Sequence, residues 1–415
     1  MVLVWKARER KEDMKQIHRI PFLIIGGGIG GLATALALSR KGYSVHLIEK
    51  AHEFSEIGAG IQIAPNGSRM LDELGILAEI HTYAVYPQRL LLVDALSGEP
   101  FTALDFGELF QRAYQYPYFV MHRNDLLTIL LNACRESDAI ILETKREVIA
   151  IEDLGDGARV ICADGTTYEC DALIGADGLK SVVRTYVVGD GDPVCAEFVA
   201  YRGAIPMEEV IETAGMDTIR YWIGPNLHLI QYPLRRGELY NQVAVFKSEH
   251  YRADSDDWGT EEELEAHFAQ THESVKRALA RVKRDRRWPL YDRLPTDNWT
   301  RHHITLLGDS AHPMLQHIAQ GACQALEDAV CLAEAVSSNH QGDVERAFRS
   351  YQEERIPRTA RVQRSARLFG DIIHSNGLTA LLRNELFLRR APDDFTYTDW
   401  FYGYQPERKE TSDGH

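Results

Sequence analysis

The segment PFLIIGGGIGGLATALALSRKGYSVHLIEK, at residues 21–50, constrains the fold more than any other part of the chain. The apolar run Phe22–Ile25 predicts a short buried strand, and a glycine-rich turn follows it directly. Leu32–Arg40 has the small and apolar residues of a closely packed helix, and Tyr43–Ile48 predicts a second strand. Two strands joined by a helix in so short a segment predict a βαβ unit, whose strands are parallel.

The glycines of this turn and one acidic residue predict a dinucleotide-binding site. Gly26 permits a tight turn, Gly28 lets a pyrophosphate approach the backbone, and Gly31 lets the helix pack close to the first strand. The helix N-terminus favours an anion, because free N–H groups point at the ligand. Glu49 ends the second strand, where its carboxylate can accept hydrogen bonds from ribose hydroxyls. The alternative interpretation is a glycine-rich turn in an ordinary α/β unit.

Two later segments, YECDALIGADGLKSVVR and ITLLGDSAHP, have the same form as the first strand and its turn. In each, a buried strand is predicted to end in a turn that contains Gly and Asp, at Asp177-Gly178 and at Gly308-Asp309. The carboxyl ends of strands in an open parallel sheet converge on one crevice. The sequence therefore predicts that three distant segments contribute to one site, which a simple nicotinamide dehydrogenase does not need.

Length and composition exclude several other classes of protein. A chain of 415 residues is long enough for two or three domains. The net charge of −15 argues against a nucleic-acid partner, and no apolar run is long enough to predict a membrane span. The six cysteines form no CxxC pair, and the N-terminus lacks the apolar core of a secretory signal. We expect a cytoplasmic protein with buried, reduced thiols.

Together, these three segments resemble the fingerprints of the single-component FAD-dependent aromatic hydroxylases, the group A flavoprotein monooxygenases. The resemblance covers about residues 20–405. It implies bound FAD, NADH or NADPH as the electron donor, O₂ as co-substrate, and a C4a-hydroperoxyflavin as the hydroxylating species. A small phenolic acid is the implied substrate.

The resemblance also implies an α/β fold, in which a mixed β-sheet substrate domain interrupts a Rossmann-like FAD-binding domain and C-terminal helices follow. The FAD-binding domain would comprise residues 20–90, 120–195 and 295–375, and the substrate domain residues 91–119 and 196–294. Residues 1–19 would form an extension, and residues 376–415 a helix and an aromatic tail. The tail could pack on its own domain, form the contact of a possible homodimer, or touch lipid.

Five further residues match positions that contact FAD in the family. Gly60, in the segment IGAGIQ, resembles a loop near the flavin ring, and Arg123 resembles an arginine near the phosphates and ribose. The alternative for Arg123 is a surface residue at a helix start. Asp309 resembles a ribose-binding aspartate, and Pro313 a residue packed near the ring. Gly321 would open a helix whose N-terminus favours negative charge at the flavin N1–C2=O edge.

A second group of residues points to the substrate. If GPNLHLIQYPL is a strand, His228 and Tyr232 share one face. Together with the HPMLQHIAQG segment that holds Gln316, and with GAGIQIAPN, YRGAIP, NQVAVF and the aromatic tail, they resemble the 3-hydroxybenzoate 6-hydroxylases. The resemblance implies that His228 and Gln316 bind and deprotonate the phenol and that Tyr232 orients it. Unperturbed phenol and imidazole pKa values differ by about 3.5 units, or ~5 kcal/mol, so the site must also stabilise the phenolate or relay the proton. The alternative for His228 is a core histidine with a hydrogen-bond partner.

Several alternatives remain at this stage. The best single prediction for the reaction is 3-hydroxybenzoate to gentisate, while salicylate 1-hydroxylation and hydroxynicotinate hydroxylation need the same phenolate. A non-catalytic flavin-fold protein that binds a lipid or protein partner is an alternative from another class. Arg202 has the right charge for a substrate carboxylate, but nothing else singles it out. His312 and His317 lack a carboxylate or thiol at helical spacing, so we expect no metal site.

Overall fold

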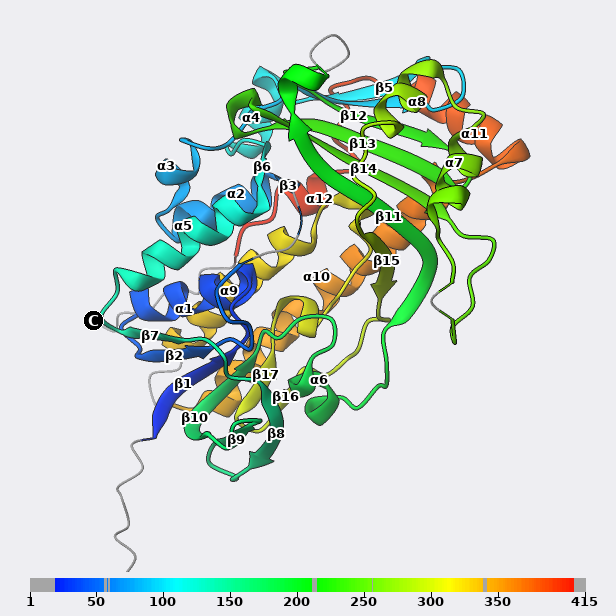
Figure 1. Cartoon of the computed structure of the whole chain (residues 1–415). Coiled ribbons are helices and arrows are strands. Elements are labelled where there is room, and N and C mark those ends of the chain that lie inside the picture. Colours follow the sequence, from blue (N-terminus) through cyan, green and yellow to red (C-terminus); the bar gives the residue numbers. More distant parts are fainter. Residues whose placement is uncertain are drawn as a thin grey trace, which may run out of the picture.

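The computed structural model describes residues 19–55, 58, 60–210, 215–255, 257–338 and 342–406. Nearly all of the N-terminal extension and the end of the aromatic tail lie outside this part of the chain, as do Ile57 and Ala59 of the IGAGIQ loop. Figure 1 shows two β-sheets at opposite ends of the molecule, with long helices running between them.

The first sheet contains the βαβ unit. β1 (Ile20–Ile25) pairs in parallel with β2 (Val45–Ile48) on one side and with β10 (Thr167–Gly175) on the other. β17 (Ile304–Leu306) extends the sheet beyond β10, and β7 (Ile140–Glu143) extends it beyond β2, both in parallel. The three strands that the sequence predicts to share a crevice are thus neighbours, in the order β17-β10-β1.

Helices cover the first sheet and connect it to the second. α1 (Ile29–Arg40) packs against α9 (Gly321–Ser338) and α5 (Arg123–Arg135), and its small residues are buried on almost every side. α10 (Val344–Ile373) packs along α9 and continues toward the second sheet (Figure 1). The C-terminal end of α10 therefore lies close to strands that belong to the other end of the molecule.

The second sheet has the strand order β15-β11-β14-β13-β12-β4-β5, and every neighbouring pair is antiparallel except β12 and β4. The strands are β4 (Arg89–Asp94), β5 (Pro100–Asp105), β11 (Val194–Pro206), β12 (Thr218–Gly224), β13 (Leu227–Leu234), β14 (Leu239–Lys247) and β15 (Arg287–Asp292). This mixed sheet, reached twice by the chain, confirms the α/β fold with an interrupted first sheet. The limits of the two domains remain predictions.

The two faces of the second sheet pack against different partners. Along β13, Leu227 and Leu229 join a core with residues of α7 (Glu261–Phe268) and α8 (Glu273–Leu279). Tyr232 points the other way and joins the large core of the first sheet. His228 shares the face of Tyr232, because the side chains of a strand alternate. The face that the sequence assigns to the substrate is thus turned toward the α1 and α9 side.

Shorter elements complete the chain. They are β3 (Gly60–Ile63), β6 (Phe119–His122), β8 (Val148–Asp153), β9 (Ala158–Cys162), β16 (Thr300–Arg301), α2 (Pro65–Glu73), α3 (Leu77–Ile80), α4 (Glu108–Tyr114), α6 (Val182–Val187), α11 (Gly377–Leu388) and α12 (Asp399–Tyr402). Four 3₁₀ turns are described, η1 (Met207–Glu209), η2 (Arg235–Gly237), η3 (Gly308–Ser310) and η4 (Gln316–Ile318).

The described part of the aromatic tail packs on its own chain. Phe395 and Tyr402 meet the rings of Phe110 and Tyr114 of α4 at centroid distances of 5.5–6.0 Å. Arg358 of α10 lies over the ring of Tyr404, 3.9 Å from its centroid. Of the three options for the tail, packing on its own chain is therefore the one that these contacts match.

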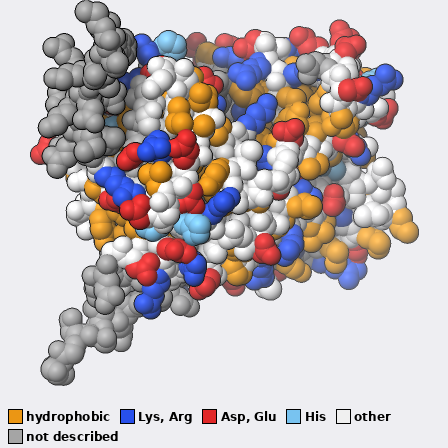
Figure 2. All heavy atoms as spheres, turned by 90° about the horizontal axis from the view of Figure 1, so that it is seen from below, with side chains coloured by type: hydrophobic (Ala, Val, Ile, Leu, Met, Phe, Trp, Pro, Cys, Tyr) orange, Lys and Arg blue, Asp and Glu red, His pale blue; other side chains and the backbone are white. Residues whose placement is uncertain are grey.

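The surface agrees with the overall composition. On the face seen in Figure 2, acidic and basic side chains are interspersed, without a broad basic area. Among the described residues, no helix is both long enough and apolar enough to cross a membrane. α11 has an unusual orientation, since it buries Arg383 and exposes five leucines. They are Leu378, Leu381, Leu382, Leu386 and Leu388.

Candidate active site

The second and third glycine-aspartate turns are held together by hydrogen bonds. The Gly178 N–H donates to Ser310 Oγ (2.9 Å), and that hydroxyl donates to Asp177 Oδ1 (3.1 Å). The buried Arg184 of α6 donates to the carbonyls of Ser310 (2.9 Å) and Ala311 (2.6 Å). The Asp177 carboxylate thus accepts hydrogen bonds within the protein. Its predicted effect on the cofactor would be indirect, because it holds together the two turns that line the site.

The first turn forms a cradle that only glycine permits. A Cβ atom on Gly26 would lie 2.3 Å from Ala176 O, and one on Gly31 would lie 2.0 Å from Gly26 O. Gly28 caps α1 without a side chain, so the first N–H groups of the helix face no capping group. The Gly27 N–H donates to Glu49 Oε2 (2.7 Å), which places this carboxylate beside the turn. These residues fit the pyrophosphate and ribose of a dinucleotide.

The third segment brings its predicted residues to the same side. Asp309 is exposed, and its Oδ1 lies 4.0 Å from the position that a Cβ on Gly321 would take. Gly321 begins α9, as predicted. Pro313 is buried, and its carbonyl accepts a hydrogen bond from Gln363 of α10 (3.0 Å). The segment between η3 and α9 is therefore fixed by packing, while its aspartate remains accessible to a ligand.

Tyr232 lies against the predicted flavin loop. Its ring fills the space beside Gly60, where an added Cβ would meet the hydroxyl at 2.4 Å. Burial raises the pKa of Tyr232, and the nearby Arg202 and Arg123 act in the opposite direction. Arg202 also stacks over the ring of Trp288, 4.1 Å from its centroid. Tyr232, Arg202 and Arg123 come from three distant segments and thus meet at one end of the β13 face.

His228 lies near the other end of this face, inside a group of three histidines. His228 Nδ1 and His374 Nε2 are 2.7 Å apart, and His374 is the residue that caps the C-terminus of α10. The ring of His317, in η4, is nearly perpendicular to both, at centroid distances of 5.5 Å and 5.2 Å. His228 is 1% exposed, so it is either a paired core histidine or a base whose ring is held in place.

Gln316 is linked to His228 through its neighbour in the chain, His317. Gln316 is exposed, and the residue of η4 that contacts His228 is His317. The sequence does not predict a partner for His317, because nothing in its local spacing suggests one. The structure adds the partners of His317. It assembles His228, His317 and His374 from β13, η4 and the end of α10, and the contact between His228 and His374 spans 146 residues of sequence.

Burial makes these histidines weak bases in the ligand-free protein. It lowers the pKa of His317 to about 4 and that of His374 to about 2, and it holds the pKa of His228 well below 6.5. Neighbouring imidazoles lower the pKa of His228 and His374 further, and Arg383 does so for His374. Proton transfer from a phenol to His228 is therefore costlier than the ~5 kcal/mol that unperturbed groups imply.

The three histidines could also be considered as metal ligands, since one nitrogen from each lies within 4.8 Å of the others. Two observations disfavour that use. Nitrogens that share a tetrahedral metal at about 2.0 Å lie about 3.3 Å apart, whereas His228 and His374 are 2.7 Å apart, a hydrogen-bond distance. The charged group that acts on His374 is Arg383, a cation, which opposes a second positive charge. We therefore treat the group as a hydrogen-bonded cluster.

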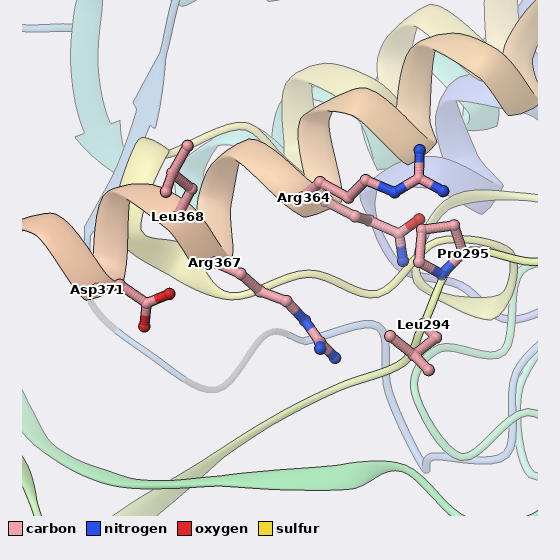
Figure 3. Close-up of a pocket in the computed structure, with 7 residues that line it drawn as sticks. Leu294, Pro295, Arg364, Arg367, Leu368 and Asp371 are labelled. Atoms are coloured by element: carbon pink, nitrogen blue, oxygen red, sulfur yellow. The ribbon is translucent and has the colours of Figure 1, made fainter.

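A shallow pocket lies beside α10, close to the Pro313 segment (Figure 3). It is lined by Leu294, Pro295, Gln363, Arg364, Arg367, Leu368 and Asp371. Arg367 is held by two hydrogen bonds to Asp292, at 2.6 Å and 2.7 Å. Gln363 connects this pocket to the interior, since its amide donates to the Pro313 carbonyl. None of the residues that line this pocket belongs to the histidine cluster.

Comparison with known proteins decides the family. A family model described as "FAD binding domain" matches residues 19–366. The chain is 40% identical over 386 residues to 3-hydroxybenzoate 6-hydroxylase of Polaromonas naphthalenivorans (strain CJ2), which covers 93% of this chain and 96% of the relative. The chain belongs to the family of FAD-dependent aromatic hydroxylases. It is an FAD-dependent monooxygenase, and the glycine cradle described above has the shape that the pyrophosphate of such a cofactor needs.

Other proteins that this hydroxylase resembles are named for different substrates or were solved with a different ligand. It is 30% identical over 383 residues to 6-hydroxynicotinate 3-monooxygenase of Bordetella bronchiseptica, covering 92% of this chain and 94% of the relative. A salicylate hydroxylase in complex with substrate matches with a TM-score of 0.77 and 25% identity, covering 93% of this chain and 96% of that chain. HpxO of Klebsiella pneumoniae, with FAD and uric acid, has a TM-score of 0.79 and 25% identity over 92% and 95% of the two chains. The family alone therefore does not select the substrate.

Proposed function

We propose that this hydroxylase converts 3-hydroxybenzoate to gentisate, with NADH or NADPH as the electron donor and O₂ as co-substrate. The observation that carries the proposal is the β13 face, which turns a buried histidine and a tyrosine toward the FAD side of the molecule. The name of the relative with 40% identity supports the same substrate. The residues that we assign to the site are His228, Gln316 and Tyr232.

The reaction needs an electron-rich ring carbon para to an ionised hydroxyl. Reduced FAD with O₂ supplies the electrophilic oxygen when the cofactor is bound. The task of the protein is to hold the ring and remove the phenol proton. We assign the proton to His228 Nε2, and the stabilisation of the phenolate to the amide of Gln316, whose side chain is accessible to a ligand.

The cost of this proton transfer can be offset within the site. A phenolate about 4 Å from the resulting imidazolium gains roughly 4 kcal/mol at an effective dielectric constant of 20. One hydrogen bond from the Gln316 amide to the anion adds about 1.5–3 kcal/mol. These contributions are of the size of the ~5 kcal/mol gap between the unperturbed groups, and burial, which widens that gap, also strengthens both contributions. Binding of the anion thus raises the pKa of His228 toward the value that the reaction needs.

We propose Arg202 as the partner of the substrate carboxylate. The strand register places Arg202, Val243 and Ile230 in one row, so all three point to the same face. Ile230 is flanked along β13 by His228 and Tyr232, each about 7 Å away along the strand. A benzoate ring over Ile230 can then direct its hydroxyl to His228 and its carboxylate toward Arg202. Tyr232, which lies near Arg202, would orient the ring.

Salicylate and hydroxynicotinate are the alternative substrates, because relatives bear those names. A screen of phenolic acids separates the three reactions. We expect 3-hydroxybenzoate to accelerate flavin reduction by NADH or NADPH and to yield gentisate with the carboxyl group retained. Catechol with release of CO₂ would identify a salicylate 1-hydroxylase, and a dihydroxypyridine would identify a hydroxynicotinate hydroxylase. Either product without gentisate would contradict the proposed substrate.

A cytoplasmic location and a homodimer are further proposals. All six cysteines are free, and five of them are buried, which fits a reducing compartment. The five exposed leucines of α11 are an apolar surface that a second copy of the chain could cover. Light scattering of the purified enzyme tests the proposed homodimer, since a monomer has a mass of 47.0 kDa and a dimer twice that.

A further inference from the structure

The hydrogen bond between His228 and His374 fixes how protons are distributed in the cluster. The two ring planes are nearly parallel, at 17°, and their nearest nitrogens are 2.7 Å apart. A neutral imidazole has one N–H donor and one acceptor nitrogen. Either His228 donates through Nδ1, or His374 donates through Nε2. Only the first arrangement leaves His228 Nε2 with a lone pair that can accept a proton from a ligand.

The position of His374 favours that first arrangement. His374 is the C-cap of the 30-residue helix α10, whose unpaired carbonyls carry partial negative charge. Nδ1 is the ring nitrogen nearest to the main chain, so this field favours a proton on Nδ1 and a lone pair on Nε2. Phe198 stacks on the His374 ring at 4.4 Å and keeps it in place. His374 Nε2 is then the acceptor, and His228 Nδ1 must be the donor.

We propose that His374 is a positioning residue, which holds His228 in the tautomer that can act as a base. In the proton transfer, the phenol O–H bond breaks and an N–H bond forms at His228 Nε2, while the electron pair stays on the phenolate oxygen. No bond of His374 changes. Its hydrogen bond to His228 becomes charge-assisted in the imidazolium, and such bonds are roughly twice as strong as neutral ones. A neutral His374 that accepts this bond thereby offsets part of the burial that weakens His228 as a base, whereas a proton on His374 would lower the pKa of His228.

The surroundings of the pair define what else acts on it. His317 of η4 faces both rings, Tyr221 of β12 lies 5.2 Å from the His228 ring, and Arg383 of α11 acts on His374. Arg383 donates to the Ile373 carbonyl (2.9 Å) at the end of α10. This cation disfavours a proton stored on His374. The pair is therefore suited to orient His228 and not to carry the proton onward.

Two substitutions of His374 separate positioning from packing. In His374→Gln, the side-chain oxygen can take the place of Nε2 and accept the His228 Nδ1 proton. In His374→Asn, the amide is similar in chemistry but too short to reach His228. A residue that serves only to fill space would give the same result in both variants. FAD absorbance and the melting temperature of each variant show whether the fold and the cofactor site are retained.

The first measurement needs no substrate and does not depend on the proposed function. Long-range ¹H–¹⁵N spectra of the FAD-loaded, histidine-labelled enzyme report the tautomer of each ring, and the His228→Gln variant identifies the His228 signals. We expect the Nδ1–H tautomer of His228 in the wild type and in His374→Gln, and a shift toward Nε2–H in His374→Asn. An Nε2–H tautomer of His228 in the wild type would overturn the inference.

The second measurement rests on the proposed function. The absorbance of bound 3-hydroxybenzoate, followed against pH, gives the midpoint at which its phenol ionises in the site. We expect His374→Asn to raise this midpoint by about one unit, a tenfold loss, and His374→Gln to restore it. Equal midpoints in the two variants would contradict the positioning role. If the wild type has the expected tautomer but does not ionise 3-hydroxybenzoate, the proposed substrate is wrong and the tautomer assignment stands.

Discussion

At the scale of single residues, two of the residues assigned to the substrate, His228 and Tyr232, lie on one face of β13, while Gln316 comes from η4. His228 is buried among two other histidines, while Tyr232 lies beside Gly60 of the predicted flavin loop. Ile230 separates them, which leaves about 13 Å between their Cα atoms. A ring of the size of a benzoate can span this interval. Burial holds the pKa of His228 well below 6.5 in the ligand-free protein, and we expect a bound phenolate to raise it.

Removal of the base tests this arrangement. We expect the His228→Ala variant to retain FAD, because the predicted contacts to the cofactor lie in other segments. Its rate of hydroxylation should fall by roughly 10²–10⁴-fold. Gentisate formation and bound FAD are the two measurements. His302→Ala is a matched control, since His302 is exposed and pairs with Asp153 far from this face. Unchanged turnover in His228→Ala would remove His228 from the reaction.

Arg202, the proposed partner of the substrate carboxylate, can be compared with a second arginine on the same Trp288 ring. Arg202 and Arg286 both stack over Trp288, at 4.1 Å and 3.8 Å from its centroid, but Arg286 is exposed. We expect Arg202→Gln to raise the KM for 3-hydroxybenzoate about tenfold or more, because a charged hydrogen bond is lost. Arg286→Gln should leave the KM unchanged. Equal effects of the two substitutions would show that Arg202 supports the fold and does not bind substrate.

At the scale of elements, the βαβ unit is where sequence and structure agree most closely. α1 begins directly after the glycine turn, and the backbone of Gly26 and the helix at Gly31 are in contact. A buried ion network supports the third strand-end segment from behind. Asp328 of α9 accepts from His312 Nε2 (2.5 Å), from the Gly308 N–H (3.0 Å) and from Arg355 of α10 (2.7 Å). Two helices thus fix the turn that carries Asp309.

A single methyl group should disrupt the cradle. In Gly31→Ala, the new Cβ would lie 2.0 Å from the Gly26 carbonyl oxygen, so β1 and α1 must separate. We expect the purified variant to have lost most of its FAD absorbance. Gly107→Ala is the control, because its Cβ would meet nothing within 4 Å. Full FAD binding by Gly31→Ala would contradict the assignment of this turn to the cofactor.

Much of this organisation is predictable from the sequence, and the reasons are local. Gly26, Gly31 and Glu49 belong to one short unit, in which spacing alone sets the geometry. The alternation along β13 likewise predicts that His228 and Tyr232 share a face. The contact of His228 with His317 and His374 is not predictable in this way, because three distant segments meet there through tertiary packing. The same holds for Asp328, a helical residue whose three partners come from outside its own turn.

At the scale of the whole molecule, two sheets are joined by helices that end at the site. α10 packs on the first sheet's helix layer and delivers His374 to the second sheet, so the histidine cluster lies where the two ends of the molecule meet. Buried neutral histidines in this position connect the stability of the fold to pH. Their effect reaches beyond the site, because loss of the contact between His374 and His228 would separate the end of α10 from β13.

The direction of the pH effect follows from the lowered pKa values. Below about pH 6.5 the unfolded chain takes up protons that the buried His317, with a pKa of about 4, does not. The contribution of His317 to stability should therefore be constant above pH 7 and fall as the pH drops from 6.5 to 4, by on the order of 3 kcal/mol. Urea unfolding at a series of pH values measures this. His317→Gln should show a shallower fall between pH 6.5 and 4, and an identical slope would contradict the role of this histidine.

The central claim is tested most directly by the stoichiometry of turnover with 3-hydroxybenzoate. NADH or NADPH oxidation, gentisate and hydrogen peroxide are measured in the same reaction. The proposed site predicts one gentisate for each nicotinamide oxidised, with little peroxide, because the ring is held and ionised beside the flavin. Oxidation of the nicotinamide that yields peroxide and no gentisate would contradict the claim.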